Sequence, residues 1–405
     1  MKGKYMSSPQ NSSKIGVAIA TIVGMNAMIG AGIFAVPTAL AASVGPAGII
    51  TYFFVIFAVW FMAQSIARVA QLYPQEGSFY TYAAQWGGHT IGLIAAGMYL
   101  IGLLIAMGLL AQMAGTYLQS AFPIITETQW GIITLFILII LNMCGVIISE
   151  IGQIILICCT IFPLIATSLL CLTQANLNNL TPFFPHGIGN LFSATKIVIF
   201  GFMGFECAAS LFNIVKNPAQ NVPRALTYAI IAVGALYLLF ISSIILSIPL
   251  DFFTHLRIPL TDILATIFPN NRWVLMAIHF SILSAIIGTL HSMIWSSSSL
   301  LLIYFKKIHN VIISKLIASG VLNEYASIII IGICIFMSFI TLKNPDLFFS
   351  FAAILIVGAY ASAMIALLSL NSEWKSGQNI KTIIGLGTAG LIMYFALHSL
   401  IAMYI

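Results

Sequence analysis

The sequence predicts an all-α integral membrane protein with about eleven transmembrane helices, and three observations support this prediction. Of its 405 residues, 61% are hydrophobic and only 6% are charged, whereas about a quarter of the residues of a soluble protein are charged. Apolar stretches of about twenty residues recur along the whole chain, and each can cross a hydrocarbon core roughly 30 Å thick as a helix. The short alternating segments typical of a membrane β-barrel are not seen.

The positions of the spans follow from the apolar runs between polar, proline and glycine residues. In order, they are 15 to 43, 45 to 73, 88 to 121, 129 to 149, 150 to 173, 191 to 215, 223 to 249, 273 to 303, 326 to 342, 346 to 371 and 380 to 405. The polar connections are short enough to be loops or surface helices, such as the basic and apolar stretch 304 to 319. Residues 1 to 405 are therefore predicted to form one transmembrane domain.

The basic residues predict the orientation of these spans. With the N-terminus inside, the cytoplasmic side collects eleven of the 15 cations: Lys2, Lys4, Lys14, Arg68, Lys216, Arg224, Lys306, Lys307, Lys315, Lys375 and Lys381. The other four, Lys196, Arg257, Arg272 and Lys343, fall on the outer side. The positive-inside rule then predicts a multi-pass protein of the cytoplasmic (plasma or inner) membrane with a cytoplasmic N-terminus.

Two spans carry glycines where an ordinary transmembrane helix would have leucine or isoleucine. The first span reads "GMNAMIGAGIFAVP" (24 to 37), and the sixth reads "FGFMGFE" (200 to 206). Glycines at such spacing also allow close helix packing. Two matched clusters five helices apart, one of them beside a membrane-embedded acid, instead favour paired helix breaks, which indicate the binding site of an inverted-repeat transporter. The freed N–H groups suit a carboxylate and the freed carbonyls suit an ammonium.

Three stretches resemble the amino acid/polyamine/organocation (APC) family of transporters. "KIGVAIATIVGMNAMIGAGIFAVPTALAASVGPAG" (14 to 48) is similar to that family's first helix, and "GFECAASLFNIVKNPAQNVPRAL" (204 to 226) is similar to its sixth helix and the following loop. "YPQEGSFYTYAAQWGG" (73 to 88) is similar to its loop after helix two, with Ser78 where a second glycine is usual. The resemblance implies that this chain is an amino acid permease or antiporter similar to the arginine/agmatine exchangers.

The resemblance also implies a five-plus-five inverted-repeat fold with helices 1 and 6 broken. Repeat one would cover about 15 to 173, repeat two about 191 to 371, and an extra helix about 380 to 405. The family usually has twelve helices rather than eleven, so the helix count and the choice between monomer and homodimer stay open. Some proton-coupled members carry a lysine in helix five, and "EIGQIILICCTIFPLIATSLL" (150 to 170) has none.

By the same resemblance, the backbone at the two breaks would bind substrate. The N–H groups of Gly30, Ala31 and Gly32 would take the α-carboxylate, and carbonyls near Met28, Phe200 and Met203 would take the α-amino group. The predicted substrate-binding set is Met28, Ile29, Gly30, Ala31, Gly32, Phe200, Met203 and Gly204. Phe200 falls at the position of a gating aromatic.

Glu206 is the carboxylate that needs an explanation. An ionised carboxylate within a membrane span is costly, so it should have a functional role, a partner or contact with water. We expect it to couple substrate occupancy to protonation or to movement of a gate; the alternative is a permanently protonated acid bonded to a freed carbonyl. Four weaker pocket candidates are Met107, His291, Met293 and Trp295. Rough alignment places Met107 and Met293 near the side-chain pocket, which would then be apolar. His291 and Trp295 share a helix face, and His291 is either a proton relay or a packing histidine.

These features predict secondary active transport of amino acids or related amines by alternating access, either proton-coupled or by exchange. No GxxxxGK[ST] loop for ATP is present. One alternative is an integral-membrane enzyme, which would need clustered His, Asp or Glu side chains. Another is a channel, which large unitary currents would distinguish from a transporter. The expected partners are a small-molecule substrate and the lipid bilayer. We expect no nucleic acid, cofactor or metal, and the six cysteines show no metal-ligand spacing.

Overall fold

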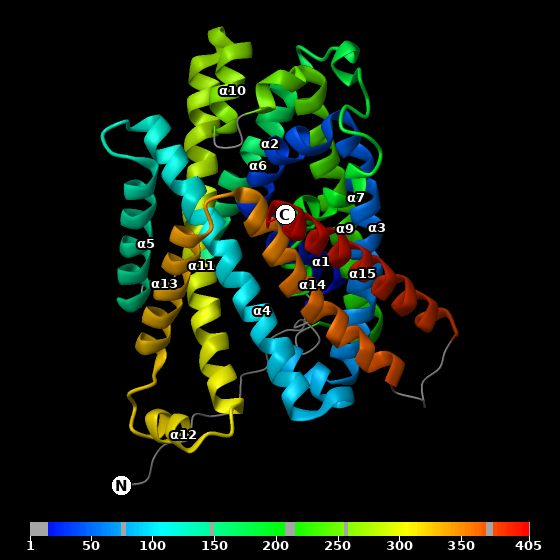
Figure 1. The fold of residues 1–405 in the computed structure, drawn as a ribbon, viewed down its shortest axis with the longest axis vertical. Helices are drawn as coiled ribbons and strands as arrows, with labels where there is room; N and C mark the ends of the chain where they lie inside the picture. The colour runs from blue at the N-terminus through cyan, green and yellow to red at the C-terminus, as the bar shows by residue number, and fades with distance from the viewer. Residues whose placement is uncertain are drawn as a thin grey trace.

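The computed structural model describes residues 15–73, 78–145, 150–206, 215–254, 258–369 and 376–404. These residues form a bundle of long helices joined by short turns (Figure 1). The one β contact among them is an isolated parallel bridge between Ile15 and Val215. The bridge joins the start of the first span to the segment that follows the sixth. The predicted all-helical membrane fold is confirmed.

Each of the eleven predicted spans corresponds to a helix or to a pair of helices. The first is α1 (Val17–Met28) with α2 (Gly32–Val44), and the sixth begins with α7 (Asn190–Ser193) and α8 (Thr195–Phe200). The others are α3 (Gly48–Leu72), α4 (Ser78–Ala121), α5 (Glu127–Met143), α6 (Glu150–Leu172), α9 (Pro218–Ser247), α11 (Arg272–Lys307), α13 (Glu324–Thr341), α14 (Pro345–Ser369) and α15 (Ser376–Tyr404). The part of the sixth span from 207 to 214 lies outside the described residues.

The connections contain short helices. They are α10 (Leu260–Ile267), α12 (Val311–Ala318) and the 3-10 turns Gly45–Ala47, Leu177–Leu180, Leu250–Thr254 and Pro269–Asn271. Helix α12 lies within the stretch expected to form a surface helix. Helix α4 starts ten residues before the predicted third span, but it is kinked at Gly88, where φ is 72°, so the predicted boundary marks a change of direction.

Length and hydropathy support membrane insertion of the described helices. Seven described segments are long and apolar enough to cross a membrane, the continuous run Gly32–Leu72 counting as one. Four apolar helices are shorter: Val17–Met28, Glu127–Met143, Cys158–Leu172 and Asn190–Phe200. The first and last of these are the halves of spans 1 and 6 that precede a break, so their shortness is a consequence of the breaks.

The helix contacts have the symmetry expected of two five-helix repeats. Contacts of α1 with α9 (spans 1 and 7) correspond to contacts of α8 with α3 (spans 6 and 2). Contacts of α4 with α14 (spans 3 and 10) correspond to those of α11 with α6 (spans 8 and 5). Contacts of α4 with α5 correspond to those of α11 with α13. Exchanging each of spans 1 to 5 with the span five places later therefore maps one set of neighbours onto the other, as expected for repeats related by a two-fold axis.

The surface of the bundle is as apolar as its interior at many positions. Phe53, Phe136 and Trp273 are 61%, 65% and 82% exposed, respectively. Large apolar side chains that face outward are typical of a surface covered by lipid. Lys196, counted from sequence as a cation of the outer side, is instead buried within α8, with 3% of it exposed. A buried cation needs a partner, which is described below.

Candidate functional site

The first predicted break is present in the structure. Helix α1 ends at Met28, and α2 begins only at Gly32. Between them, the N–H of Gly30 donates to the Met28 carbonyl at 2.9 Å, and the N–H of Ala31 donates to Oγ1 of Thr289 on α11 at 3.1 Å. These N–H groups therefore have short-range or side-chain acceptors in place of the i−4 carbonyls of a continuous helix.

The carbonyl of Met28, at the end of α1, also has a partner. The hydroxyl of Tyr237 on α9 donates to it at 3.0 Å. With the bond from the Gly30 N–H, this carbonyl already accepts two hydrogen bonds and uses both of its lone pairs, so a substrate ammonium would have to displace one of these donors. Thr289 and Tyr237 were not found from the sequence because each is one of several polar residues in a long membrane helix. Each also lies more than 200 positions from the break it contacts.

The second predicted break follows Phe200, where α8 ends and the chain enters a turn. Gly204 in this turn has φ of 111°, a backbone conformation that L side chains rarely adopt. A Cβ at this position would also collide with the carbonyl oxygen of Ala27 in α1. Glycine is thus required both by the turn and by the close approach of the two backbones.

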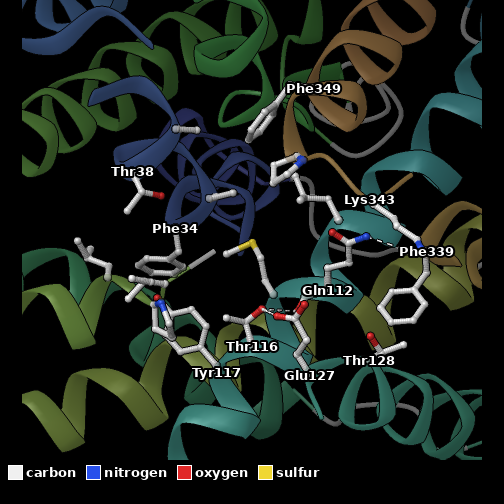
Figure 2. A pocket seen from close by; sticks show the side chains of 18 of the residues that line it. Phe34, Thr38, Gln112, Thr116, Tyr117, Glu127, Thr128, Phe339, Lys343 and Phe349 are labelled. Carbon is white, nitrogen blue, oxygen red and sulfur yellow. Dashed lines mark hydrogen bonds between the residues drawn. The ribbon is translucent and has the colours of Figure 1, made fainter. Parts of the chain in front are cut away.

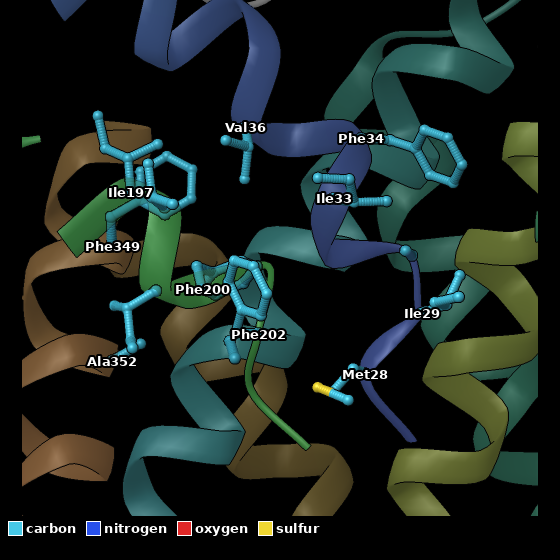
Figure 3. Packing of buried hydrophobic residues seen from close by; sticks show 14 of the residues in the cluster. Met28, Ile29, Ile33, Phe34, Val36, Ile197, Phe200, Phe202, Phe349 and Ala352 are labelled. Carbon is cyan, nitrogen blue, oxygen red and sulfur yellow. The ribbon is translucent and has the colours of Figure 1, made fainter. Parts of the chain in front are cut away.

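The structure brings the two breaks together, as Figure 3 shows. Besides the Gly204 contact with Ala27, a Cβ on Gly32 would lie 3.2 Å from the Phe200 ring. The Phe200 ring packs edge-on against Phe349 of α14, with ring centroids 5.2 Å apart at 89°. Main-chain groups of both broken helices and one aromatic pair therefore meet at one place in the bundle.

Glu206 is buried, with 9% of it exposed, and both of its carboxylate oxygens accept hydrogen bonds. The hydroxyl of Tyr99 on α4 donates to Oε1 at 2.6 Å, and the hydroxyl of Tyr360 on α14 donates to Oε2 at 2.6 Å. The N–H of Gly204 donates to Oε2 at 3.0 Å. We call Tyr99, Glu206 and Tyr360 the tyrosine–glutamate cluster.

Aromatic packing holds the tyrosine–glutamate cluster in place. The Phe79 ring lies 4.4 Å from the Tyr99 ring and 5.7 Å from the Tyr360 ring. The Phe205 ring also packs against Tyr360, with ring centroids 4.9 Å apart. Two short hydroxyl bonds to a carboxylate are strong contacts, and they tie the chain after the second break to α4 and α14.

The four weaker pocket candidates are distributed over different environments. Met107 is fully buried, and Met293 is partly buried against the core. His291 is buried and contacts Asn142 of α5, with Nδ1 2.9 Å from the amide nitrogen. Trp295, one turn further along α11, is 40% exposed. These four side chains differ in burial, and their role in a pocket stays a prediction.

The largest described cavity lies on the α10 side of the breaks and has a volume of about 410 Å³ (Figure 2). We call it the α10-side cavity. Its walls come from α2, α4, α5 and α14, from the start of α10 with the segment before it, and from the end of α13 with the segment after it. They include Phe34, Thr38, Gln112, Thr116, Tyr117, Glu127, Leu260, Phe339, Lys343 and Phe349. None of the residues predicted for the site lines it, although Phe349 connects it to Phe200.

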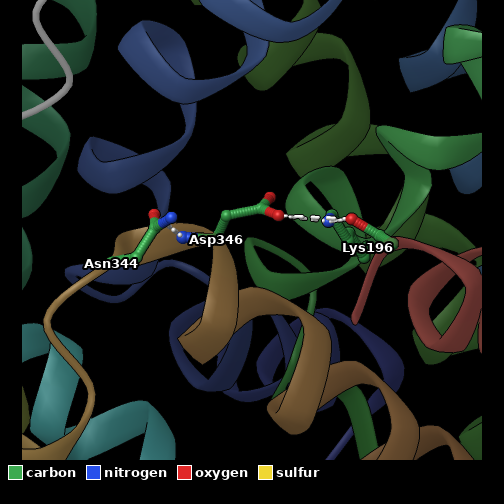
Figure 4. A network of polar contacts seen from close by, with 4 residues as sticks. Lys196, Asn344 and Asp346 are labelled. Atoms are coloured by element: carbon green, nitrogen blue, oxygen red, sulfur yellow. Dashed lines mark hydrogen bonds and ion pairs between the residues drawn. The ribbon is translucent and has the colours of Figure 1, made fainter. Parts of the chain in front are cut away.

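A buried ion pair joins the first half of the sixth span to two other helices. The ammonium of Lys196 lies 2.7 Å from the Asp346 carboxylate at the start of α14 (Figure 4). It also contacts the hydroxyl of Ser399 on α15, which donates to the same carboxylate oxygen at 3.2 Å. Asn344 accepts from the N–H of Asp346 at 3.0 Å and so fixes the start of α14.

Comparison with known proteins adds independent findings. The family model for the amino acid permeases matches residues 20–322. An uncharacterized amino acid permease of Bacillus subtilis, YecA, is 27% identical over 226 residues, which are 54% of this chain and 52% of YecA. The branched-chain amino acid permease BcaP of the same organism is 25% identical over 244 residues, 55% of this chain and 52% of BcaP.

The gamma-aminobutyric acid permease of Bacillus subtilis is 24% identical over 302 residues, which are 69% of this chain and 62% of that protein. The chain spans about half the length of the first two of these relatives. The family match includes both breaks, Glu206 and Thr289.

Proposed function

The chain belongs to the amino acid permease family, and from this membership we propose that it is a secondary transporter that moves amino acids or related amines across the cytoplasmic membrane by alternating access. The observation that carries the proposal is the meeting of two helix breaks, at Met28 to Gly32 and at Phe200 to Gly204, inside an apolar bundle. Unwound backbone within a membrane is tolerated where protein or a watery cavity satisfies its polar groups.

The proposed substrate position follows from the backbone groups at the breaks. The N-terminus of α2, at Gly30 to Gly32, would bind the α-carboxylate. The carbonyls of Met28, Phe200 and Met203 would bind the α-amino group. The N–H of Ala31 donates to Thr289, so an incoming carboxylate would exchange places with a neutral hydroxyl, which is a weaker acceptor.

Two clusters would gate this position. On the α10 side, Phe200 and Phe349 close the path between the breaks and the α10-side cavity. On the opposite side, the tyrosine–glutamate cluster closes the path to the cytoplasm in the proposed topology, with the N-terminus cytoplasmic. Glu206 would then couple the cluster to the transported solute or to a proton.

The repeats implied by the sequence fit this scheme. We propose that 15 to 173 and 191 to 371 are the two inverted repeats and that α15 is an additional helix. The symmetric helix contacts support this division. Alternating access would then result from rocking of one set of helices against the other around the breaks.

Uptake into proteoliposomes tests the function. A panel of labelled amino acids is offered with and without internal amino acid, and with and without an imposed pH gradient. Acceleration by internal amino acid indicates exchange, and acceleration by an inward proton gradient indicates proton coupling. If none of the panel is taken up above protein-free vesicles under any condition, the proposal is wrong.

A Glu206→Gln variant tests the coupling role. Glutamine keeps the size of the side chain but cannot ionise. We expect transport by this variant to lose its pH dependence, whereas the matched variant Glu324→Gln, at the start of α13, retains it. If Glu206→Gln transports with the rate and pH dependence of the wild type, the carboxylate has no coupling role.

A further inference from the structure

The end of the bundle that carries α12 holds cations without a counter-ion. Lys306 and Lys307 lie in the last turn of α11, and Lys315 lies on α12. None of these three lysines forms an ion pair with a residue that the structure describes. The acid nearest to them in sequence, Glu324 at the start of α13, is itself exposed. In the proposed topology, this end of the bundle faces the cytoplasm.

Two histidines extend this group of cations to α4. The ring of His309, just after α11, stacks on the ring of His89, with centroids 4.5 Å apart and 16° between the planes. Nδ1 of His89 lies 2.8 Å from the Tyr80 hydroxyl, and no described residue bonds its Nε2 or either ring nitrogen of His309. The Lys307 ammonium lies 5.1 Å from the centroid of the Tyr80 ring, a contact that does not neutralise its charge. We call His89, Lys306, Lys307 and His309 the basic cluster.

The basic cluster offers hydrogen-bond donors and positive charge, so it suits an anion with several acceptor oxygens. An ammonium group donates three hydrogen bonds, and an imidazole donates at least one. Hydrogen bonds from a charged donor to phosphate are roughly twice as strong as those between neutral groups. An anion would also offset the repulsion between the two adjacent lysines. It would join α4 to the segment after α11, because the stacked rings come from these two parts of the chain.

An apolar surface begins directly after the basic cluster. Val311 and Ile312 of α12 are 71% and 68% exposed, and none of the residues of this helix is buried. Figure 1 shows α12 at the end of the bundle, near the end of α11 and the start of α13. A helix with exposed apolar side chains and a lysine is typical of the membrane interface. A ligand that joins an anionic group to hydrocarbon chains therefore matches the whole surface, whereas a free phosphate ion matches only the basic cluster.

We propose that the basic cluster binds the phosphate group of an anionic phospholipid from the cytoplasmic leaflet, while the exposed apolar side chains of α12 rest among the acyl chains. The inference goes beyond the proposed function, because the lipid is a bound partner and not a transported solute. Lys307 also lines the cavity of about 40 Å³ that Tyr99 borders. A headgroup held by the basic cluster therefore bridges α4 and α11 beside the tyrosine–glutamate cluster.

Native mass spectrometry of the purified full chain tests the site. Palmitoyl-oleoyl phosphatidylglycerol (POPG), which is anionic, or the matching phosphatidylcholine (POPC), which is zwitterionic, is titrated into the protein in detergent. We expect one POPG to bind at least about ten-fold more tightly than POPC, because the basic cluster repels the choline cation.

Lys306→Gln, at an exposed position, should weaken the binding of this POPG about five-fold, the contribution of one lysine near an anionic lipid. The matched variant Arg272→Gln removes a cation from the opposite end of the same helix, also at an exposed position. It should leave the affinity for POPG unchanged.

His309→Gln tests the histidines, again at an exposed position. It should weaken POPG binding about two- to ten-fold, as expected for the loss of one hydrogen bond. His186→Gln, at an exposed position before α7, makes the same chemical change elsewhere and should bind POPG as the wild type does. Inorganic phosphate in large excess should leave POPG bound, because a free anion gains nothing from the apolar surface of α12.

The proposal is wrong if POPG binds the wild type no more tightly than POPC does, or if Lys306→Gln and His309→Gln both keep the wild-type affinity. It is also wrong if the two control variants weaken POPG binding as much as these two do. Displacement of POPG by inorganic phosphate would show that the site takes a free anion, which contradicts the lipid assignment. The measurement needs no transported solute, so failure of the proposed function and failure of the lipid site are distinguishable.

Discussion

Removal of either partner of the Lys196–Asp346 ion pair should destabilise the protein, but by unequal amounts. Lys196 is 3% exposed and Asp346 is 26% exposed. In Asp346→Asn the ammonium stays buried beside a neutral amide and Ser399, and an uncompensated buried charge costs about 3 to 5 kcal/mol of stability. In Lys196→Met the carboxylate remains partly hydrated and keeps the Ser399 bond at 3.2 Å, so we expect a loss of about 1 to 3 kcal/mol.

The double variant Lys196→Met/Asp346→Asn provides the sharper test. With no charge left to bury, it should be more stable than Asp346→Asn alone, so the loss in the double variant should be smaller than the sum of the two single losses by more than the loss in Lys196→Met. The assay is reversible unfolding in mixed micelles of dodecyl maltoside and SDS, followed by tryptophan fluorescence, for the wild type, both single variants and the double variant.

Two results would refute this reasoning. If Lys196→Met costs as much stability as Asp346→Asn, the difference in exposure does not determine the cost. If the double variant loses the sum of the two single losses, the residues do not interact energetically, and the contact at 2.7 Å contributes nothing to the stability of α8, α14 and α15.

Three further predictions concern the breaks and the carboxylate. Gly204→Ala should lower the free energy of unfolding by at least about 2 kcal/mol, because φ is 111° and the α1 backbone leaves no room for a Cβ. It should therefore reduce the yield of monodisperse protein. The control Gly189→Ala, at a position with open space around it, should leave that yield unchanged. Tyr360→Phe removes one donor to Glu206 and should lower stability by about 1.5 to 3 kcal/mol; unchanged unfolding in the same micelles would contradict this. Thr289→Val removes the hydroxyl that a substrate carboxylate must displace, so the KM for uptake should fall about two- to ten-fold, and a raised KM would contradict the exchange.

The helix breaks were predictable because their signal is local. Glycines clustered in "IGAGIF" and "GFMGF" interrupt an apolar run, and the backbone conformation at Gly204 depends on its lack of a side chain. The partners of the breaks are not local. Tyr99 and Tyr360 reach Glu206 from 107 and 154 residues away, and each lies in an apolar helix whose rotation the sequence does not reveal.

The pocket candidates on α11 also show that the sequence does not reveal which residues of an apolar helix face the site. His291 and Trp295 are four residues apart and share one face of α11, and along that face His291 is buried against α5 while Trp295 is 40% exposed. In a soluble helix, polar residues mark the outer face, whereas in lipid the outer face is also apolar. Thr289, in the same helix, contacts the break instead.

The closed state of the tyrosine–glutamate cluster bears directly on how transport would be driven. The described cavities are unequal: about 410 Å³ on the α10 side, and about 40 Å³ beside Tyr99 and Lys307. Opening the second side would separate the chain after the sixth-span break from α4 and α14. It would break two hydroxyl bonds to a carboxylate, at about 1.5 to 3 kcal/mol each. Their sum, about 3 to 6 kcal/mol, is close to the 5.5 kcal/mol that moves a two-state equilibrium from 99:1 to 1:99. Neutralising Glu206 by protonation, or offering it an ammonium instead, removes much of that barrier, so the protein would open toward the second side mainly when a proton or a substrate cation is present.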